Sequence, residues 1–284
     1  MDDQQRKSQS WSSYWRQAQP QVSCLPGAPP ALGNLLDGIW SSFAKSIDRD
    51  SSVVDLACGN GVVGFSMNGV VQSLDIVGID YAELPISWTP PFPILQESID
   101  KTSLGDDSMD AAVSQFGIEY ADTAKVGKEL ARILKPGGQM QFIMHYDGSV
   151  ILKANEVREK LLSDAKSSDI WTAANDRDLQ KLQSIFDGLL KSHGETPLFL
   201  EIASAVRTAL NFEEEERKEV LEALQTSMAG ELDIIASLKS AAIGPSELDK
   251  WTKKLGKHFH FDDPKVIRIG DDTICWNLTG SHQP

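Results

Sequence analysis

The sequence is poor in cysteine, in positive charge and in long apolar runs, and each shortage excludes a class of protein. Its three cysteines, Cys24, Cys58 and Cys275, stand far apart and fit neither a metal-binding motif nor a disulfide framework. Lys and Arg number 27 against 41 Asp and Glu, and the net charge of -14 argues against binding to nucleic acid or to an anionic membrane. No stretch approaches the roughly 18 apolar residues of a membrane span, and the polar start is not a secretory signal. We therefore expect a soluble, cytoplasmic protein with no nucleic-acid or membrane partner.

The chain of 284 residues is long enough for one large α/β domain with an insertion. Residues 1–33 are polar with scattered aromatic side chains, and 34–150 alternate short β-branched runs with helical patterns. Residues 151–257 are almost entirely helical in pattern, and 258–284 return to strand character. The alternation in the second region is typical of βαβ units and predicts a parallel sheet.

Five strands and one helix are readily predicted in that region. The strands are SSVVDLA, LDIVGID, FPILQES, MDAAVSQF and GQMQFIMHY. Between the last two, TAKVGKELARILKPGG has an apolar stripe at helical spacing, and Pro136 with Gly137 and Gly138 is predicted to end the helix.

The most informative stretch is VVDLACGNGVVG, residues 53–64. A buried strand carries Asp55 and runs into a glycine-rich turn and a helix. Glycines allow a tight turn and a close approach of ligand to backbone, and the helix start supplies free N–H groups. Gly59, Gly61 and Gly64 match the dinucleotide fingerprint G-x-G-x-x-G, a pattern that is weak by itself.

Two carboxylates narrow the choice of ligand. Asp55 stands four residues before Gly59, where it would repel a pyrophosphate but suit a ligand with an ammonium group. Asp80 closes the second strand, 21 residues after Gly59, where a carboxylate accepts the two ribose hydroxyls. The pair indicates a nucleoside that also carries a positive charge.

Several motifs in order resemble the class I S-adenosylmethionine-dependent methyltransferases. They are DLACGNG, GID, the acidic turn SIDKTSLGDDSMDAAVSQF and ELARILKPGGQMQF, within roughly residues 50–146. The terminal HFHFDDPKVIRIGDDTICWNLTG looks like the sixth and seventh strands of that fold, the last one antiparallel. The resemblance implies an α/β, Rossmann-like, seven-stranded and mostly parallel sheet with helices on both faces. Residues 151–257 would then be a helical insertion between the fifth and sixth strands, and S-adenosylmethionine would be the cofactor.

The resemblance also implies cofactor-binding roles for matching residues. Asp55 would orient the methionine ammonium, Asp80 would bind the ribose hydroxyls, and Tyr81 or Ala82 would flank the adenine. Asp100 and the backbone of Lys101 align with the adenine-recognition position, although the acidic turn that follows is shorter than usual in the family. The full set expected at the cofactor is Asp55, Ala57, Gly59, Gly61, Asp80, Tyr81, Asp100, Lys101, Gln115 and Phe116.

Candidate catalytic groups follow the fourth and fifth strands, because open α/β sheets bind ligands at the carboxyl ends of their strands. His145 has the most suitable unperturbed pKa for a general base, and Glu119 is the other candidate. Each has an alternative role: His145 as a structural or orienting group, and Glu119 as a hydrogen-bond partner of the acceptor or of a loop.

The acceptor pocket is expected to be closed by segments outside the core. Residues 1–33 form an aromatic cap and 151–257 a lid in this interpretation, although the helices would serve equally as a dimer interface or a buttress. The aromatic residues expected at the substrate are Trp11, Tyr14, Trp15, Tyr120 and Tyr146.

The sequence therefore predicts methyl transfer to a small-molecule acceptor. An NAD(P)-dependent oxidoreductase is opposed by Asp55 and the LKPGG unit. A protein that binds S-adenosylmethionine without methylating remains open as a partner or regulator, since methyl transfer needs no obligatory catalytic side chain. An RNA or protein acceptor suits the acidic charge poorly. No cluster of carboxylates and histidines indicates a metal, and neither the methylated atom nor the oligomeric state is readable from the sequence.

Overall fold

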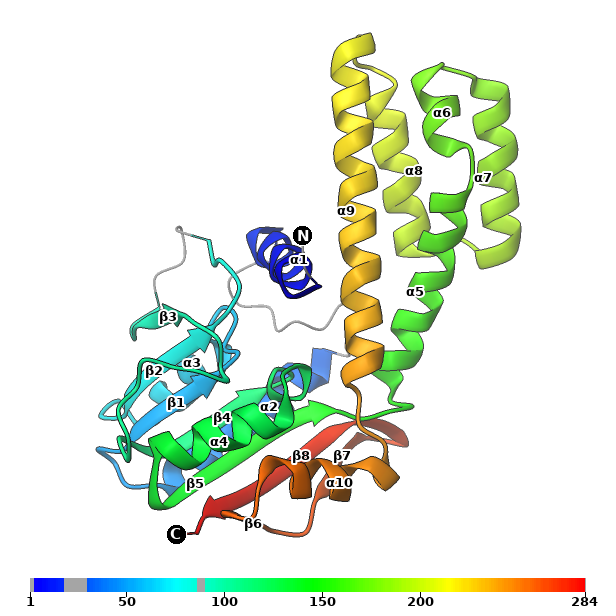
Figure 1. Ribbon diagram of the computed structural model, residues 1–284. Helices are drawn as coiled ribbons and strands as arrows, with labels where there is room; N and C mark the ends of the chain where they lie inside the picture. The colour runs from blue at the N-terminus through cyan, green and yellow to red at the C-terminus, as the bar shows by residue number, and fades with distance from the viewer. Residues whose placement is uncertain (1–2, 18–29, 86–89, 284) are drawn as a thin grey trace. The chain divides into compact units, whose positions relative to one another are not determined.

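The computed structural model describes residues 3–17, 30–85 and 90–283. Contacts divide the chain into two compact units, Met1–Lys153 with Ser237–Pro284, and Ala154–Ala236. The first unit holds the sheet (Figure 1). Its eight strands, counted over the described residues, are β1 (Ser52–Leu56), β2 (Asp75–Asp80), β3 (Ile94–Gln96), β4 (Met109–Gln115), β5 (Leu134–His145), β6 (Phe259–Phe261), β7 (Lys265–Ile269) and β8 (Asp272–His282).

The sheet has the strand order β3-β2-β1-β4-β5-β8-β6, and β7 also pairs with β8. Strands β1 to β5 pair in parallel, whereas β8 is antiparallel to β5, β6 and β7. The predicted mostly parallel α/β sheet with an antiparallel last strand is thereby confirmed. This order brings the carboxyl ends of β1, β2 and β4 together at one edge of the sheet.

The predicted count of seven strands is wrong by one, because the expected sixth strand is divided. β6 and β7 lie along the same edge of β8, pairing with Gly280–His282 and with Asp272–Asn277. Pro264 lies between them and has no N–H to donate to a ladder. Pairing therefore stops after Phe261 and resumes at Lys265.

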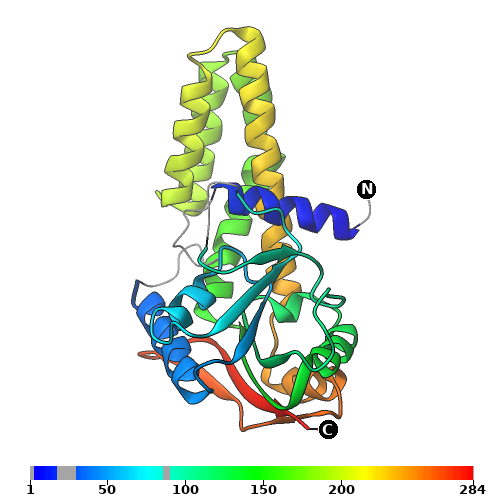
Figure 2. The same ribbon diagram turned by 90° about the vertical axis from the view of Figure 1, so that its left-hand side faces the viewer.

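Helices cover both faces of the sheet, each over its own apolar core (Figure 2). Trp40 and Met67 belong to one core, and Leu130 and Trp251 to the other. The helices on the first face are α2 (Pro30–Ser46) and α3 (Val62–Asn68), and those on the second are α4 (Thr123–Ile133) and α10 (Pro245–Leu255). Because helices bury both faces of the sheet, strands such as β1 have nearly continuous apolar sequences.

Helix α4 ends earlier than its apolar pattern predicts. The sequence placed its end at Pro136, but α4 stops at Ile133 and the LKPGG segment opens β5. Pro136 disfavours helical backbone in the residue before it, and Leu134 is already extended with φ -77° and ψ 130°. The glycine-rich segment is therefore part of the strand.

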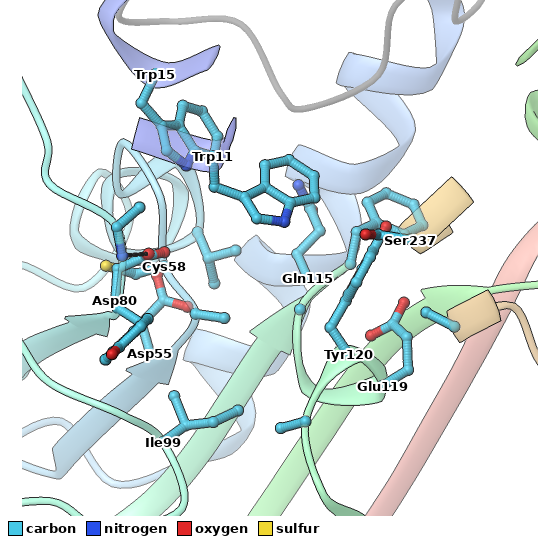
Figure 3. Close-up of a pocket in the computed structure, with 18 of the residues that line it drawn as sticks. Trp11, Trp15, Asp55, Cys58, Asp80, Ile99, Gln115, Glu119, Tyr120 and Ser237 are labelled. Atoms are coloured by element: carbon cyan, nitrogen blue, oxygen red, sulfur yellow. Dashed lines mark hydrogen bonds between the residues drawn. The ribbon is translucent and has the colours of Figure 1, made fainter. Parts of the chain in front are cut away.

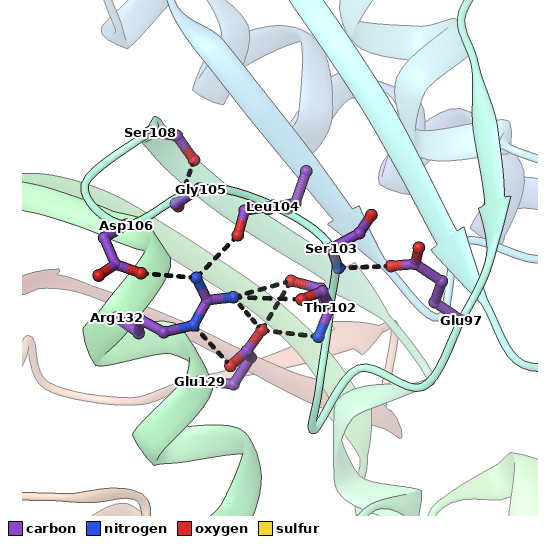
Figure 4. Close-up of polar contacts among 9 residues, drawn as sticks. All are labelled: Glu97, Thr102, Ser103, Leu104, Gly105, Asp106, Ser108, Glu129 and Arg132. Carbon is purple, nitrogen blue, oxygen red and sulfur yellow. Dashed lines mark hydrogen bonds and ion pairs between the residues drawn. The ribbon is translucent and has the colours of Figure 1, made fainter.

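The loop from β3 to β4 is tied to α4 by a polar network (Figure 4). Arg132 donates to the Leu104 carbonyl and to Asp106, both at 2.7 Å. Glu129 accepts the backbone N–H and the hydroxyl of Thr102, both at 2.7 Å. These bonds fix a loop whose start, after Gln96, reaches the carboxyl edge of the sheet.

The second unit is helical and has its own core. It is built from parts of α5 (Val150–Ser167) and α9 (Glu214–Ala241) with α6 (Ile170–Asn175), α7 (Leu179–His193) and α8 (Pro197–Ala209). The buried Arg217 donates to the carbonyls of Asn175 and Phe212, and so joins the ends of three helical segments. The helical character expected of 151–257 is seen, while its role as a lid stays a prediction. Among the described residues, no helix has both the length and the apolar character needed to cross a membrane.

Candidate functional site

A pocket with a cavity volume of about 280 Å³ lies at the carboxyl edge of the sheet, within the first unit. Its walls come from the ends of β1, β2 and β4, from the 3₁₀ helix η1 (Ile118–Tyr120), from α1 (Asp3–Gln17) and from the last turns of α9. Figure 3 shows two ends. Asp55 and Asp80 define the β1–β2 end, and Glu119, Tyr120 and Ser237 define the η1 end.

Asp55 is a buried carboxylate without a hydrogen-bond partner among the described residues. It is fully buried at the end of β1, and neither carboxylate oxygen makes a hydrogen bond to a described residue. Burial raises the pKa of Asp55 to about 8, with a smaller contribution from the charge of Asp80; the nearby N–H of Gly64 opposes the shift. An isolated buried carboxylate is costly, so this arrangement suits a ligand that brings a positive charge or N–H donors.

Asp80 organises the turn beside it. Its two oxygens accept the backbone N–H groups of Gly59 (2.7 Å) and Ala82 (2.8 Å). Burial raises the pKa of Asp80, and the N–H groups of Ala82 and Gly59 act in the opposite direction. Each carboxylate oxygen has a second lone pair, so further hydroxyl donors fit these same oxygens.

Backbone strain gathers at this pocket. Among the described residues, Ala57 (φ 53°) and Phe116 (φ 54°) are two of the four non-glycine residues with positive φ, and both line the cavity. Such conformations cost about 1–3 kcal/mol and cluster at functional sites. Gly59 also has positive φ, and a Cβ there would lie 2.2 Å from the ring of Trp15. The turn thus needs glycine both for its conformation and for the close approach of α1.

The η1 end is built around Glu119. Glu119 is 7% exposed and its Oε1 accepts the backbone N–H of His145 at 2.8 Å, whereas Oε2 has no partner among the described residues. Burial raises the pKa of Glu119 to about 7. Between the two ends, the buried Trp40 donates its indole N–H to Gln115 Oε1 at 2.6 Å and fixes the orientation of that amide.

His145 does not reach the pocket, contrary to its expected place at the acceptor. It is fully buried at the end of β5, with its ring stacked on Phe116 at 4.5 Å between centroids. Burial lowers the pKa of His145 to about 3, so the imidazole is neutral at physiological pH. Its backbone N–H, and not its ring, donates to Glu119, so the orienting role of the imidazole stays a prediction.

The structure brings most of the other predicted residues to one pocket. The predicted residues that line it are Trp11, Trp15, Asp55, Ala57, Asp80, Tyr81, Gln115, Phe116, Glu119 and Tyr120. Gly59 and Gly61 form the turn at its edge, both with positive φ. Two predicted substrate contacts are not among the lining residues: Tyr14 packs against Trp11 and Trp15, and Tyr146 packs on Trp276.

Asp100 and Lys101 likewise do not line the pocket; Ser98 and Ile99 do. The chain turns back here, with a bridge between Ser98 and Lys101, and the Asp100 carboxylate accepts the Ser98 hydroxyl at 2.7 Å. Asp100 is thus used in closing the turn, directly after Ile99, the last residue of this loop that lines the cavity.

Helix α9 belongs to the segment 151–257 that is predicted to form a lid, but no local pattern singles out the residues of this helix that line the pocket. Ser237, Ser240 and Ala241 line the η1 end from the last turns of that helix. They are more than a hundred residues from the other lining residues, and small side chains at helical spacing carry no local signal of a site. No group of His, Cys, Asp and Glu in the described part of the chain is arranged to hold a metal ion.

Comparison with known proteins assigns the segment that carries this pocket. Residues 54–142 match the family described as a methyltransferase domain. The match covers this segment and not the whole chain. Within it lie Asp55, Asp80 and Glu119, the three carboxylates of the pocket.

The methyltransferase domain has relatives of known name. Over 113 residues the chain is 31% identical to the demethylmenaquinone methyltransferase of Corynebacterium kroppenstedtii. The aligned part covers 37% of this chain and 48% of that protein. The chain thus spans about half the length of this curated relative.

Solved structures are similar over most of the chain. A chain from the complex of the Haloferax volcanii Trm112 methyltransferase activator with a methyltransferase is 14% identical, with a TM-score of 0.48, covering 96% of this chain and 97% of that one. A methyltransferase from Methanosarcina mazei is also 14% identical, with a TM-score of 0.45 and coverage of 90% and 98%.

The residues of the methyltransferase domain fit S-adenosylmethionine as methyl donor. The orphaned Asp55 carboxylate matches the ammonium of its methionine part, and Asp80 matches two ribose hydroxyls. These two groups project into the same pocket from neighbouring parallel strands. A pyrophosphate would instead meet two carboxylates and no cationic side chain among the described lining residues.

Proposed function

We propose that the protein transfers the methyl group of S-adenosylmethionine to a small-molecule acceptor. The observation that carries the proposal is the pairing of a buried, unpartnered Asp55 with Asp80 in one pocket of a methyltransferase domain. S-Adenosylmethionine, when bound, supplies an electrophilic methyl group on a sulfonium. The protein then has to bind and orient both reactants and to keep water away.

The residues divide this work between them. Asp55 holds the ammonium and Asp80 the ribose, while Gln115 and Phe116 at the end of β4 stand between the two ends of the pocket. Trp11 and Trp15 of α1 cover it from the side opposite the strands (Figure 3). Alignment of two bound reactants replaces a bimolecular encounter and contributes up to about 7–11 kcal/mol.

The small-molecule acceptor is supported by the charge of the chain. A net charge of -14 disfavours a nucleic-acid acceptor. A protein that binds the cofactor without methylating is the alternative. The cytoplasmic location inferred from the sequence is part of the proposal.

Transfer of isotopic label tests the proposal directly. The protein is incubated with methyl-labelled S-adenosylmethionine and either the small-molecule fraction, the protein fraction or the RNA fraction of a cell extract. We expect label in the small-molecule fraction, in amounts that depend on Asp80. Label in protein or RNA would contradict the acceptor class, and tight binding with no transfer to any fraction would favour the non-catalytic alternative.

The affinity for S-adenosylhomocysteine is expected to rise with pH. The pKa of Asp55 is about 8 in the ligand-free pocket, and an ammonium ligand binds the ionised form, so binding releases a proton below that pH. The dissociation constant should therefore fall roughly tenfold per pH unit from about pH 6 towards pH 8, and then level off. Calorimetry across this range measures it, with Asp55→Asn as the variant in which the dependence flattens. A flat profile in the unmodified protein would show that Asp55 does not meet the ammonium.

A further inference from the structure

We infer that the acceptor is a small amine whose nitrogen is held by Glu119 at the η1 end of the pocket. The inference rests on the proposed function, since it assigns the acceptor of that same site. Three observations carry it: the charge of the lining, the unpartnered oxygen of Glu119, and the aromatic rings beside it.

The charged side chains that line the pocket are all acidic. Asp55, Asp80 and Glu119 contribute carboxylates, and no Lys, Arg or His is among the described lining residues. An acceptor with a carboxylate or phosphate would find no counter-charge here and would be repelled. Asp55 and Asp80 are occupied by the methyl donor in the proposed function, which leaves Glu119 to meet the acceptor.

Glu119 has one oxygen fixed and one oxygen available. The His145 N–H holds Oε1 at 2.8 Å, and Oε2 is buried with no partner among the described residues. Figure 3 shows the carboxylate at the opposite end of the pocket from Asp55 and Asp80. A buried carboxylate oxygen without a donor is costly, and an N–H or ammonium group of the acceptor removes that cost.

No neighbouring group supplies the missing positive charge. His145 is neutral because burial lowers its pKa to about 3. Burial, together with the charge of Glu119, raises the pKa of the Cys275 thiol to about 12, so this neighbour carries no charge either. Burial accordingly raises the pKa of Glu119 to about 7, as expected for a carboxylate that still lacks its cation.

Aromatic rings complete a surface suited to a cation. Trp11 and Tyr120 both line the pocket and meet edge to face, with centroids 5.6 Å apart. Tyr120 also meets the ring of His145 edge to face at 5.9 Å. The negative faces of such rings attract ammonium groups, an attraction that a neutral hydroxyl does not share.

The chemistry of transfer is consistent with this placement. An acceptor that binds as an ammonium first loses one proton to solvent. The lone pair of the neutral amine then forms the new nitrogen–carbon bond while the sulfur–carbon bond breaks and its electron pair stays on sulfur. Positive charge therefore moves from sulfur to nitrogen, towards Glu119, which stabilises it as it develops. The extra proton on nitrogen then passes to the Glu119 carboxylate and on to solvent, leaving the methylated amine.

Matched ligands test the inference on the protein saturated with S-adenosylhomocysteine. Benzylamine, phenethylamine and cyclohexylamine are compared with the alcohol and the carboxylate of the same carbon frame, using saturation-transfer NMR. Methylation of each amine is then followed by mass spectrometry with S-adenosylmethionine. We expect binding and methylation to favour the amine of each set, and the carboxylate not to bind.

Glu119→Gln is the variant that isolates the charge. Its amide oxygen still accepts the His145 N–H, and the change replaces Oε2 with an NH₂ that repels an amine. We expect amine methylation to fall by about 100-fold or more in kcat/KM while the affinity for S-adenosylhomocysteine is kept. Asp50→Asn removes the same charge from an exposed position and is the matched control.

The possible outcomes distinguish a failure of the proposed methyl transfer from a failure of the amine assignment. Failure of S-adenosylhomocysteine to bind would overturn the proposed function itself. With that ligand bound, equal binding of alcohol or carboxylate, no binding of any amine, or an amine preference that survives in Glu119→Gln would overturn the amine assignment. A Glu119→Gln protein with an unchanged melting temperature excludes misfolding as the cause of lost activity.

Discussion

Replacing Asp55 with asparagine is expected to weaken the binding of S-adenosylhomocysteine by about 100-fold at pH 8 and to make the ligand-free protein more stable. Binding falls because the amide carries no charge to meet the ligand's ammonium. Asp55 is fully buried and its oxygens have no hydrogen-bond partner among the described residues, so the native contacts do not compensate the loss of its hydration. The two effects have opposite signs, which a general folding defect would not produce.

The expected gain in stability follows from the direction of the pKa shift. Burial raises the pKa of Asp55 from 3.8 to about 8, so the folded protein holds a proton that the unfolded chain releases between these values. The free energy of unfolding therefore falls as pH rises through that window, and the loss is largest above pH 8. Asparagine does not titrate and removes this penalty. The melting temperature of the ligand-free variant should exceed that of the unmodified protein, by more at pH 8 than at pH 5.

Calorimetry and differential scanning fluorimetry measure the two effects on the same samples. Asp50→Asn, at an exposed position, is the control for loss of one negative charge and should change neither quantity. If Asp55→Asn bound the ligand as tightly as the unmodified protein, the assignment of the ammonium contact would be wrong.

Replacing Asp80 with alanine is expected to weaken the binding of S-adenosylhomocysteine and, unlike Asp55→Asn, to lower the melting temperature. The Asp80 carboxylate accepts the N–H groups of Gly59 and Ala82, and alanine would leave both buried donors without a partner. Each such loss costs about 1–3 kcal/mol. The glycine turn loses its anchor at the same time as the ribose loses its acceptor, so we expect an affinity loss of about 100-fold or more.

Asp80→Asn is the companion variant for separating these roles. It keeps one acceptor oxygen, so its stability should lie between those of the alanine variant and the unmodified protein, and some affinity should remain. Unfolding followed by fluorescence and binding followed by calorimetry give both values. Full affinity in Asp80→Ala would mean that the nucleoside does not lie against this strand end.

The fold was predictable where local patterns and the architecture agree. The apolar runs of β1, β2 and β4 are buried on both faces by helices, so their residues mark the strands clearly. The division between β6 and β7 was missed because it depends on one proline within a favourable strand pattern, whereas Pro136 indicated the end of α4 and only its last residue differs. Pro136 extends the backbone before it, and Pro264 interrupts the ladder with β8.

The site was predictable to the extent that strand ends define it. Asp55 and Asp80 end adjacent parallel strands, so their proximity follows from the topology alone. His145 also follows a strand, but its side chain turns into the core against Phe116, a packing choice with no local signal. Ser237 of α9 is brought to the pocket by tertiary structure, and no spacing in the sequence indicates it.

A single titration tests the central claim that the pocket binds S-adenosylmethionine through its nucleoside and its ammonium. The purified protein is titrated with S-adenosylhomocysteine by calorimetry at pH 8, and with NADH under the same conditions. The account predicts saturable binding of S-adenosylhomocysteine at one site and no heat from NADH. Binding of NADH in place of S-adenosylhomocysteine would contradict it and would indicate that the glycine-rich turn binds a dinucleotide.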